Sequence, residues 1–261
     1  MSSLGPSRPL ARSCAEAIRR VTFPTRAGAV LLAHAARAFS ELETGVAMVQ
    51  RLRGIVAGRV RIGTRASIGI YLLPPVPRRV RARHPGVELI VVTGNAPEIA
   101  RAVVANTLDI GILSLPVPDR ELTVLPFYRD EPVAIAPPQA AWRRRRGITA
   151  AELAREPLIL FEHGSTQRRV VDEWFHRAGV SPAQAMELGN TEAIKKLVGA
   201  GLGVSLASGF AVRSDARAGR LVALHLVPPL VHQRGIVLRK DKPRTPALTA
   251  FLTVLQEAAT G

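Results

Sequence analysis

Four short segments carry hydroxyl, amide and glycine residues where an apolar run ends and a helix is expected to begin. They are Thr64 to Ser67, Thr93-Gly94-Asn95, Gly164-Ser165-Thr166 and Asn190-Thr191. The first turn of a helix presents unpaired backbone N–H groups and the positive end of the helix dipole, which together bind anions. Any one of these turns is better explained by helix capping, because Ser, Thr and Asn are good N-caps. Four matched turns in one chain favour a ligand cleft.

Two arginines, Arg65 and Arg168, flank these turns. A guanidinium group grips a carboxylate with two parallel hydrogen bonds, so either side chain is a candidate clamp for an acidic ligand. The alternative for each is an ordinary surface arginine in solvent or in a salt bridge. Because the turn motifs themselves contain no carboxylate, we expect a small carboxylate, sulfate or phosphate-bearing metabolite. Its nearest polar contacts are expected to be Ser67, Thr93, Ser165 and Asn190.

Motifs for catalysis and metal binding are missing from the sequence. Six histidines show no HxH or HExxH spacing, and the single Cys14 excludes a disulfide framework and a cysteine-based zinc site. The glycine-rich segment 199–203 leaves a helix and enters a strand, the reverse of the order that binds phosphate. We therefore expect no metal, no cofactor and no enzymatic activity.

The elements that must position these turns alternate between strand and helix, which predicts an α/β fold. Helical periodicity runs first from Thr25 to about Val56 and is long enough for a connector or dimerisation helix, although packing on its own domain is the alternative. The run 87–93 is expected to be a buried strand, and 122–136 an extended stretch with turns around Tyr128–Glu131. Two α/β lobes, joined near residue 136 with a return near residue 234, form the expected architecture.

The composition indicates a soluble cytoplasmic protein. The chain has 261 residues, of which 47% are apolar, and 36 Lys and Arg against 20 Asp and Glu give a formal charge of +16. This charge favours anionic partners, including small anions. No apolar run is long enough to cross a membrane, and the first residues lack the apolar core of a secretion signal.

Several stretches together resemble the LysR-type transcriptional regulators. They are RVRIGTRASIGIYLLPPVP, HPGVELIVVTGN, FEHGSTQRRV and GNTEAIKKLVGAGLGVS, and the resemblance extends over about residues 18–260. It implies a two-lobed effector-binding domain like type 2 periplasmic binding proteins, preceded by a long dimerising helix. The implied divisions are a leader or remnant of the DNA-binding wing (1–22), a linker helix (23–56) and the effector domain (57–261). Lobe one would span about 57–136 and 235–261, and lobe two about 137–234.

The resemblance also implies which residues bind the effector. The family turns match Thr64, Arg65, Ser67, Thr93, Gly94, Asn95, Gly164, Ser165, Thr166, Arg168, Asn190 and Thr191, with Thr166 standing where glycine is common. The implied partners are a small anionic effector and further copies of the chain, as a homodimer or homotetramer, with no membrane.

The first residues depart from the family, because most of the expected helix-turn-helix has no counterpart here. We therefore expect no DNA-binding residues in this chain, and promoter DNA to be reached only through a missing or partner-supplied helix-turn-helix. Two other functions suit the same fold. One is a solute-binding protein of a transport system, which the absence of an export signal argues against. The other is a small-acid enzyme, which the lack of a paired acid and base in the turns argues against.

Overall fold

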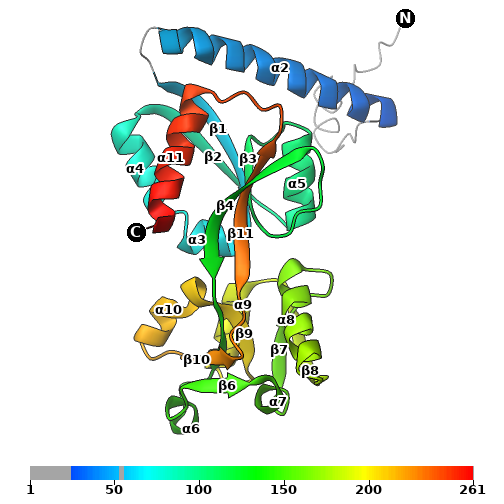
Figure 1. The fold of residues 1–261 in the computed structure, drawn as a ribbon, viewed down its shortest axis with the longest axis vertical. Helices are drawn as coiled ribbons and strands as arrows, with labels where there is room; N and C mark the ends of the chain where they lie inside the picture. Colours follow the sequence, from blue (N-terminus) through cyan, green and yellow to red (C-terminus); the bar gives the residue numbers. More distant parts are fainter. Residues whose placement is uncertain (1–24, 53–55, 261) are drawn as a thin grey trace, which may run out of the picture.

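The strand and helix alternation produces two α/β lobes placed end to end, with a long helix lying across the far end of the first lobe (Figure 1). The computed structural model describes residues 25–52 and 56–260. The expected leader, residues 1–22, lies outside the described residues. The long helix is α2 (Arg26–Leu52), as the helical periodicity predicted. It is held to lobe one partly by an ion pair between Glu43 and Arg61, 2.7 Å apart.

Lobe one is built on a five-stranded sheet in the order β2-β1-β3-β11-β4. Strands β1, β2 and β3 are parallel, and β11 runs antiparallel to both β3 and β4. The strands are β1 (Ala57–Thr64), β2 (Gly86–Thr93), β3 (Ile110–Ser114), β4 (Leu122–Asp130) and β11 (His232–Arg239). The helices are α3 (Ala66–Tyr71), α4 (Pro75–Arg83), α5 (Ala96–Val104) and α11 (Pro246–Thr260). Fully buried Ile62, Ile112 and Phe251 lie in the apolar core between the sheet and its helices.

Two features of lobe one differ from the sequence-based expectations. The strand expected to be buried at 87–93 is β2, the edge of the sheet, where Val91 and Val92 are exposed to solvent. Its apolar run is therefore only half covered. The helix expected to begin at Ser67 is two helices, because Pro74 and Pro75 follow α3 and open α4. Its first residue is Ala66, so Ser67 lies inside the helix and does not cap it.

Lobe two carries a four-stranded sheet in the order β6-β10-β5-β9 and a parallel pair, β7 and β8. An isolated parallel bridge between Leu158 and Val204 joins β7 to the entry of β9. The strands are β5 (Pro132–Ala136), β6 (Gly147–Thr149), β7 (Leu158–Phe161), β8 (Gln184–Leu188), β9 (Ser205–Ser208) and β10 (Val222–Val227). The helices are α6 (Ala140–Arg143), α7 (Ala150–Leu153), α8 (Thr166–Arg177), α9 (Thr191–Gly199) and α10 (Gly209–Arg217).

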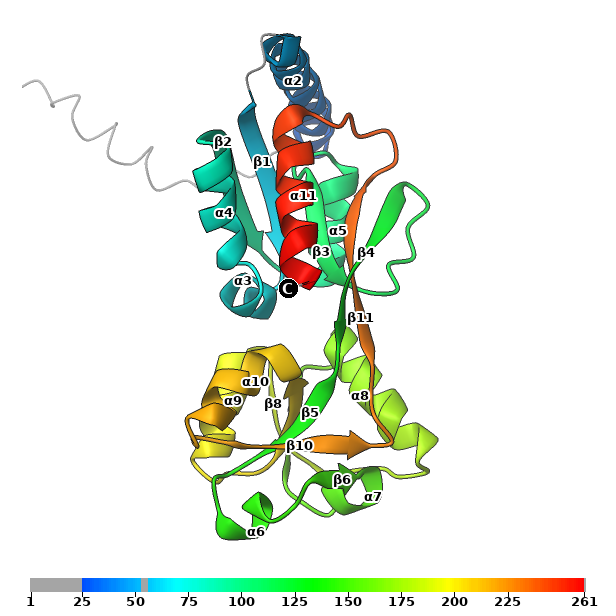
Figure 2. The ribbon, with the colours of Figure 1, turned by 60° about the vertical axis from the view of Figure 1, so that its left-hand side comes forward.

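Two chain crossings connect the lobes side by side (Figure 2). The first lies at Glu131, between β4 of lobe one and β5 of lobe two, and the second lies between the end of β10 and His232. Both crossings come a few residues earlier than the expected positions near 136 and 234. The extended stretch 122–136 is two strands in two different sheets, which an apolar pattern alone does not distinguish.

Candidate functional site between the lobes

A small pocket of about 40 Å³ lies between the start of α3 in lobe one and the start of α9 in lobe two. It brings together two of the four turns singled out in the sequence. Its lining is Arg65, Ala66, Ser67, Ile70, Gly189, Asn190, Thr191 and Glu192. Ser67 is buried, and its hydroxyl has no hydrogen-bond partner among the described residues. The pocket therefore offers a side-chain donor from lobe one opposite a helix N-terminus of lobe two.

Arg65 is the main source of positive charge in this pocket. Its guanidinium is partly buried and forms neither a hydrogen bond nor an ion pair with any described residue. Burial and the nearby charge of Arg234 hold the pKa of Arg65 below its ordinary value, and Glu162 opposes them. An unpaired, partly desolvated cation beside a second cation is electrostatically unfavourable. A bound anion would relieve that repulsion.

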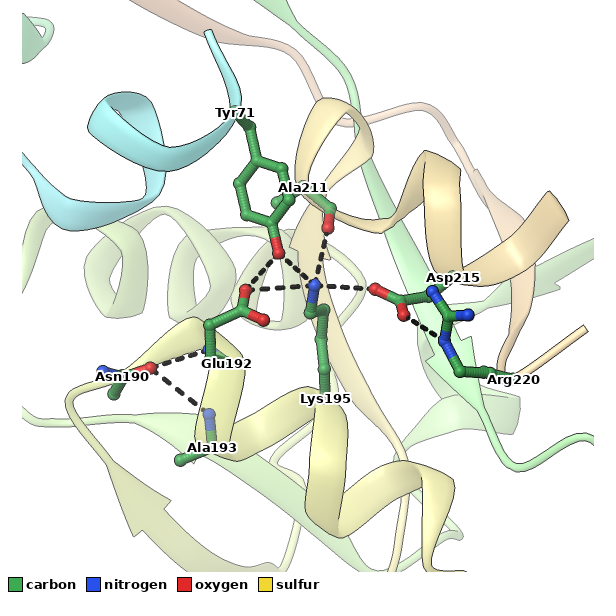
Figure 3. Close-up of polar contacts among 8 residues, drawn as sticks. All are labelled: Tyr71, Asn190, Glu192, Ala193, Lys195, Ala211, Asp215 and Arg220. Carbon is green, nitrogen blue, oxygen red and sulfur yellow. Dashed lines mark hydrogen bonds and ion pairs between the residues drawn. The ribbon is translucent and has the colours of Figure 1, made fainter. Parts of the chain in front are cut away.

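The start of α9 brings the positive end of its helix dipole and the backbone N–H of Thr191 to the same pocket. Asn190 is the N-cap, and its side-chain oxygen accepts hydrogen bonds from the backbone N–H groups of Glu192 (2.7 Å) and Ala193 (3.3 Å). The carboxylate of Glu192, in the first turn, is compensated because Tyr71 donates to it and Lys195 forms a 3.0 Å ion pair with it (Figure 3). Its negative charge is therefore largely neutralised at the site.

The other two turns are occupied by contacts of their own. Asn95 and Glu98 form a capping box at the start of α5, so a carboxylate already lies against those backbone N–H groups. Thr93 and Gly94 lie outside the pocket lining, and the buried hydroxyl of Thr64 donates to the carbonyl of Ile112. The Thr93-Gly94-Asn95 motif contains no carboxylate of its own, but the fold brings the carboxylate of Glu98 to the backbone N–H of Asn95.

At the start of α8, Ser165 caps the helix as expected, by accepting from the backbone N–H of Arg168. The guanidinium of Arg168 is buried and donates to Asp172 (2.8 Å) and to the carbonyl of Phe161 (2.9 Å). Arg168 is therefore in a salt bridge, which was the alternative to a role as a ligand clamp. Gly164 and Thr166 also lie outside the pocket lining. The free arginine at the interlobe pocket is thus Arg65.

A buried polar cluster at the crossings was missed by the sequence analysis. Arg234, fully buried on β11, donates to Asp130 (3.0 Å), to Ser114 (2.7 Å) and to Ser208 (2.9 Å). Ser114 belongs to lobe one and Ser208 to lobe two, so a single guanidinium holds both lobes at the hinge. The sequence feature that could have revealed this cluster is the pair of opposite charges, Asp130 and Arg234, one near each of the two crossings.

His232 lies in the same buried region and predicts a pH dependence of stability. Burial, with the charges of Arg234 and Arg169, lowers the pKa of His232 to about 3. The folded chain therefore keeps His232 neutral at pH values where the unfolded chain protonates it. The stabilisation that the fold gains by keeping His232 neutral is fully present above about pH 6.5. Below that pH, the free energy of unfolding should fall by roughly 1.4 kcal/mol per pH unit as the pH drops toward 3.

Urea unfolding at pH 7 and pH 5 measures this loss. Between these pH values, we expect the free energy of unfolding of His232→Gln to fall by about 2 kcal/mol less than that of the wild type. His225→Gln, which changes an exposed histidine on β10, serves as the control and should follow the wild type. An equal loss in wild type and His232→Gln would contradict the assignment.

Within residues 25–52 and 56–260, no three His, Cys, Asp or Glu side chains are grouped so that they would hold a metal ion. Of the described helices, none is both long and apolar enough to cross a membrane.

Comparison with known proteins identifies relatives of this fold. Residues 53–260 match the family described as the LysR substrate binding domain. The transcriptional regulator CbbR of Xanthobacter flavus is 34% identical over 239 residues, covering 89% of this chain and 71% of the relative. The uncharacterised regulator YeiE of Escherichia coli K12 is 35% identical over 218 residues, covering 83% and 73%.

Among solved structures, the CcmR regulatory domain of Synechocystis in complex with 2-PG superposes with a TM-score of 0.71. It is 25% identical, and the match covers 78% of this chain and 98% of that domain. The two-lobed α/β fold predicted from the sequence is confirmed by these matches. So is the resemblance to the regulators, whose effector domains have the periplasmic-binding-protein-like architecture.

Proposed function

The chain belongs to the LysR family of transcriptional regulators, and we propose that it senses a small anionic metabolite between its two lobes. The proposed site comprises Arg65 and Ser67 of lobe one with Asn190 and Thr191 of lobe two. The other candidate residues, on the α5 and α8 turns, would border it. Binding at this position would set the relative placement of the lobes and so the regulator's response. Promoter DNA is the proposed target of that response, and the described elements include no helix-turn-helix.

The observation that carries this proposal is the unpaired guanidinium of Arg65 beside Arg234. Of these two cations, Arg65 lines the pocket, to which Ser67 adds a hydroxyl and α9 adds its N-terminal end, whereas Arg234 is fully buried at the hinge. A β-carbon at Gly189 would lie 2.8 Å from Glu162 Oε2, so that carboxylate lies beside the pocket and favours a ligand that also carries a hydroxyl group. The relatives are named as transcriptional regulators, which favours sensing over catalysis or solute transport.

Calorimetric titration with sulfate, inorganic phosphate, glycolate and 2-PG tests the proposal. We expect Ser67→Ala to weaken binding of the tightest of these anions roughly ten- to a hundredfold, because a hydrogen bond to a charged ligand is lost. Ser181→Ala, which changes an exposed serine far from the pocket, is the matched control. Equal affinities for wild type and Ser67→Ala would remove Ser67 from the site.

We also propose that α2 mediates self-association. Its apolar side chains Leu31, Phe39 and Leu42 are 71%, 67% and 68% exposed. Val30, Val46, Met48 and Val49 add to this exposed apolar surface. Large exposed apolar side chains gathered on one helix are typical of protein interfaces. A homodimer or homotetramer would cover it with a second copy of the same helix.

Light scattering at micromolar concentration measures the oligomeric state. We expect a dimer or tetramer for the wild type and a monomer, or a weaker assembly, for the double variant Leu31→Asp/Leu42→Asp. Leu202→Asp, which places the same charge on an exposed leucine of lobe two, should assemble like the wild type. A monomeric wild type, or a double variant of unchanged mass, would refute the proposal.

A further inference from the structure

Tyr71, Glu192 and Lys195 form a polar contact across the two lobes (Figure 3). Tyr71 is the last residue of α3 in lobe one, whereas Glu192 and Lys195 lie one turn apart on α9 in lobe two. The tyrosine hydroxyl donates to Glu192 Oε1 and accepts from Lys195 Nζ. Lys195 Nζ also lies 4.6 Å from the centre of the Tyr71 ring, within cation–π range. One side chain of lobe one thus meets two charged groups of lobe two.

The lobe-two side of this contact is held independently of lobe one. Lys195 is buried and donates to Asp215 Oδ2 (2.7 Å) and to the carbonyl of Ala211 (3.0 Å), both on α10. Asp215 is fixed in turn by Arg220 at 2.7 Å. Among the residues that the structure describes, the hydroxyl of Tyr71 has hydrogen-bond partners in lobe two alone. Separating the lobes would therefore leave the ammonium group satisfied and would free the tyrosine alone.

The pKa shifts of Tyr71 and Lys195 keep both groups protonated, which the hydrogen bonds between the lobes require. Burial and the hydrogen bond to Glu192 raise the pKa of Tyr71, against the opposing effect of Lys195, so the hydroxyl keeps its proton. Burial alone would lower the pKa of Lys195, but its hydrogen bonds with Asp215, Tyr71 and Glu192 raise it overall. Lys195 stays charged.

An aromatic path connects this contact to the hinge. The ring of Phe210, at the start of α10, lies 6.4 Å from Tyr71 and 5.9 Å from Tyr128, centre to centre. The guanidinium of Arg234 lies 5.7 Å from the Phe210 ring. Lobe-two residues Phe210 and Ala211 are packed into the apolar core of lobe one. Any opening of the lobes must move α10, and with it the partners of Tyr71, away from α3.

We propose that Tyr71, Glu192 and Lys195 are an interlobe latch, in which the Tyr71 hydroxyl holds the lobes together in the unliganded chain. The moving part is Tyr71, and the receiving part is the pre-formed Glu192–Lys195–Asp215 arrangement. The latch lies at the end of the pocket formed by α3 and α9, because Glu192 belongs to both. Release of Tyr71 widens that pocket.

Distances between spin labels in the ligand-free chain test the latch. Nitroxides at Arg81 on α4 and Lys196 on α9, both exposed, report the separation of the lobes in a Cys14→Ser background. Dilution with unlabelled protein restricts the measurement to distances within one chain. Tyr71→Phe removes only the hydroxyl and keeps the ring against Phe210. Tyr128→Phe is the matched control, because the Tyr128 hydroxyl has no hydrogen-bond partner among the described residues while its ring packs on the same phenylalanine.

We expect Tyr71→Phe to raise the population at longer distances roughly tenfold or more, and Tyr128→Phe to match the wild type. Glu192→Gln keeps an acceptor for the hydroxyl and should open the lobes less than Tyr71→Phe. The same distance distribution for Tyr71→Phe and wild type, or equal opening in both tyrosine variants, would overturn the latch. Since no ligand is added, this outcome is separate from that of the anion titrations.

Discussion

Arg65→Gln is expected to weaken binding of the best anion roughly ten- to a hundredfold while leaving the unliganded fold as stable as the wild type, or slightly more stable. The two effects have opposite signs because of what Arg65 faces. In the unliganded chain its charge is partly buried, unpaired and close to Arg234, so its removal relieves repulsion. In the complex the same charge would be the anion's main partner.

Calorimetric titration and thermal unfolding of one preparation measure both effects. Arg78→Gln, at an exposed position on α4, removes the same charge far from the pocket and should change neither result. Arg65→Lys keeps the charge but loses the planar fork, and we expect intermediate affinity. A strongly destabilised Arg65→Gln with unchanged anion affinity would mean that Arg65 is a structural residue.

Arg234→Met is expected to lower the free energy of unfolding by about 3–5 kcal/mol, since it leaves the buried carboxylate of Asp130 without its countercharge. Both side chains of this ion pair are 0% exposed, so solvent does not replace the lost partner. The variant also removes the guanidinium that donates hydrogen bonds to Ser114 in lobe one and to Ser208 in lobe two. Urea denaturation measures this difference in the free energy of unfolding, provided that the wild type and the variant depend equally on urea concentration.

The double variant Asp130→Leu/Arg234→Met separates pairing from packing. Replacing a buried ion pair by apolar side chains is often nearly neutral, so the double variant should recover most of the lost stability. If it is as unstable as the sum of the two single variants, Arg234 stabilises the hinge through its serine contacts and not through Asp130.

Local chemistry made parts of this structure predictable from sequence. Ser165 and Asn190 cap α8 and α9 as expected, because a cap hydrogen bond depends on residues only two or three positions apart. The family segments likewise identified the two-lobed fold. The α3 turn was placed less well, since Arg65 precedes the helix without a side-chain cap and packing of Ile68 in the core fixes its register.

Long-range pairing explains what the sequence did not reveal. Arg234 meets Ser114 and Asp130 across more than a hundred residues, and no local pattern links them. Helix α10 was not anticipated, because its N-cap Ser208 makes no capping hydrogen bond and instead contacts Arg234. The occupation of Arg168 by Asp172 and Phe161 likewise becomes visible only in the folded chain.

A crystal structure of the chain with the tightest anion of the titration panel tests whether the anion binds between the lobes. We expect ligand density there, with an anionic oxygen within hydrogen-bond distance of the Arg65 guanidinium and of the Ser67 hydroxyl or the backbone N–H of Thr191. Density for the anion anywhere outside the cleft between α3 and α9, with Arg65 still unpaired, would contradict it.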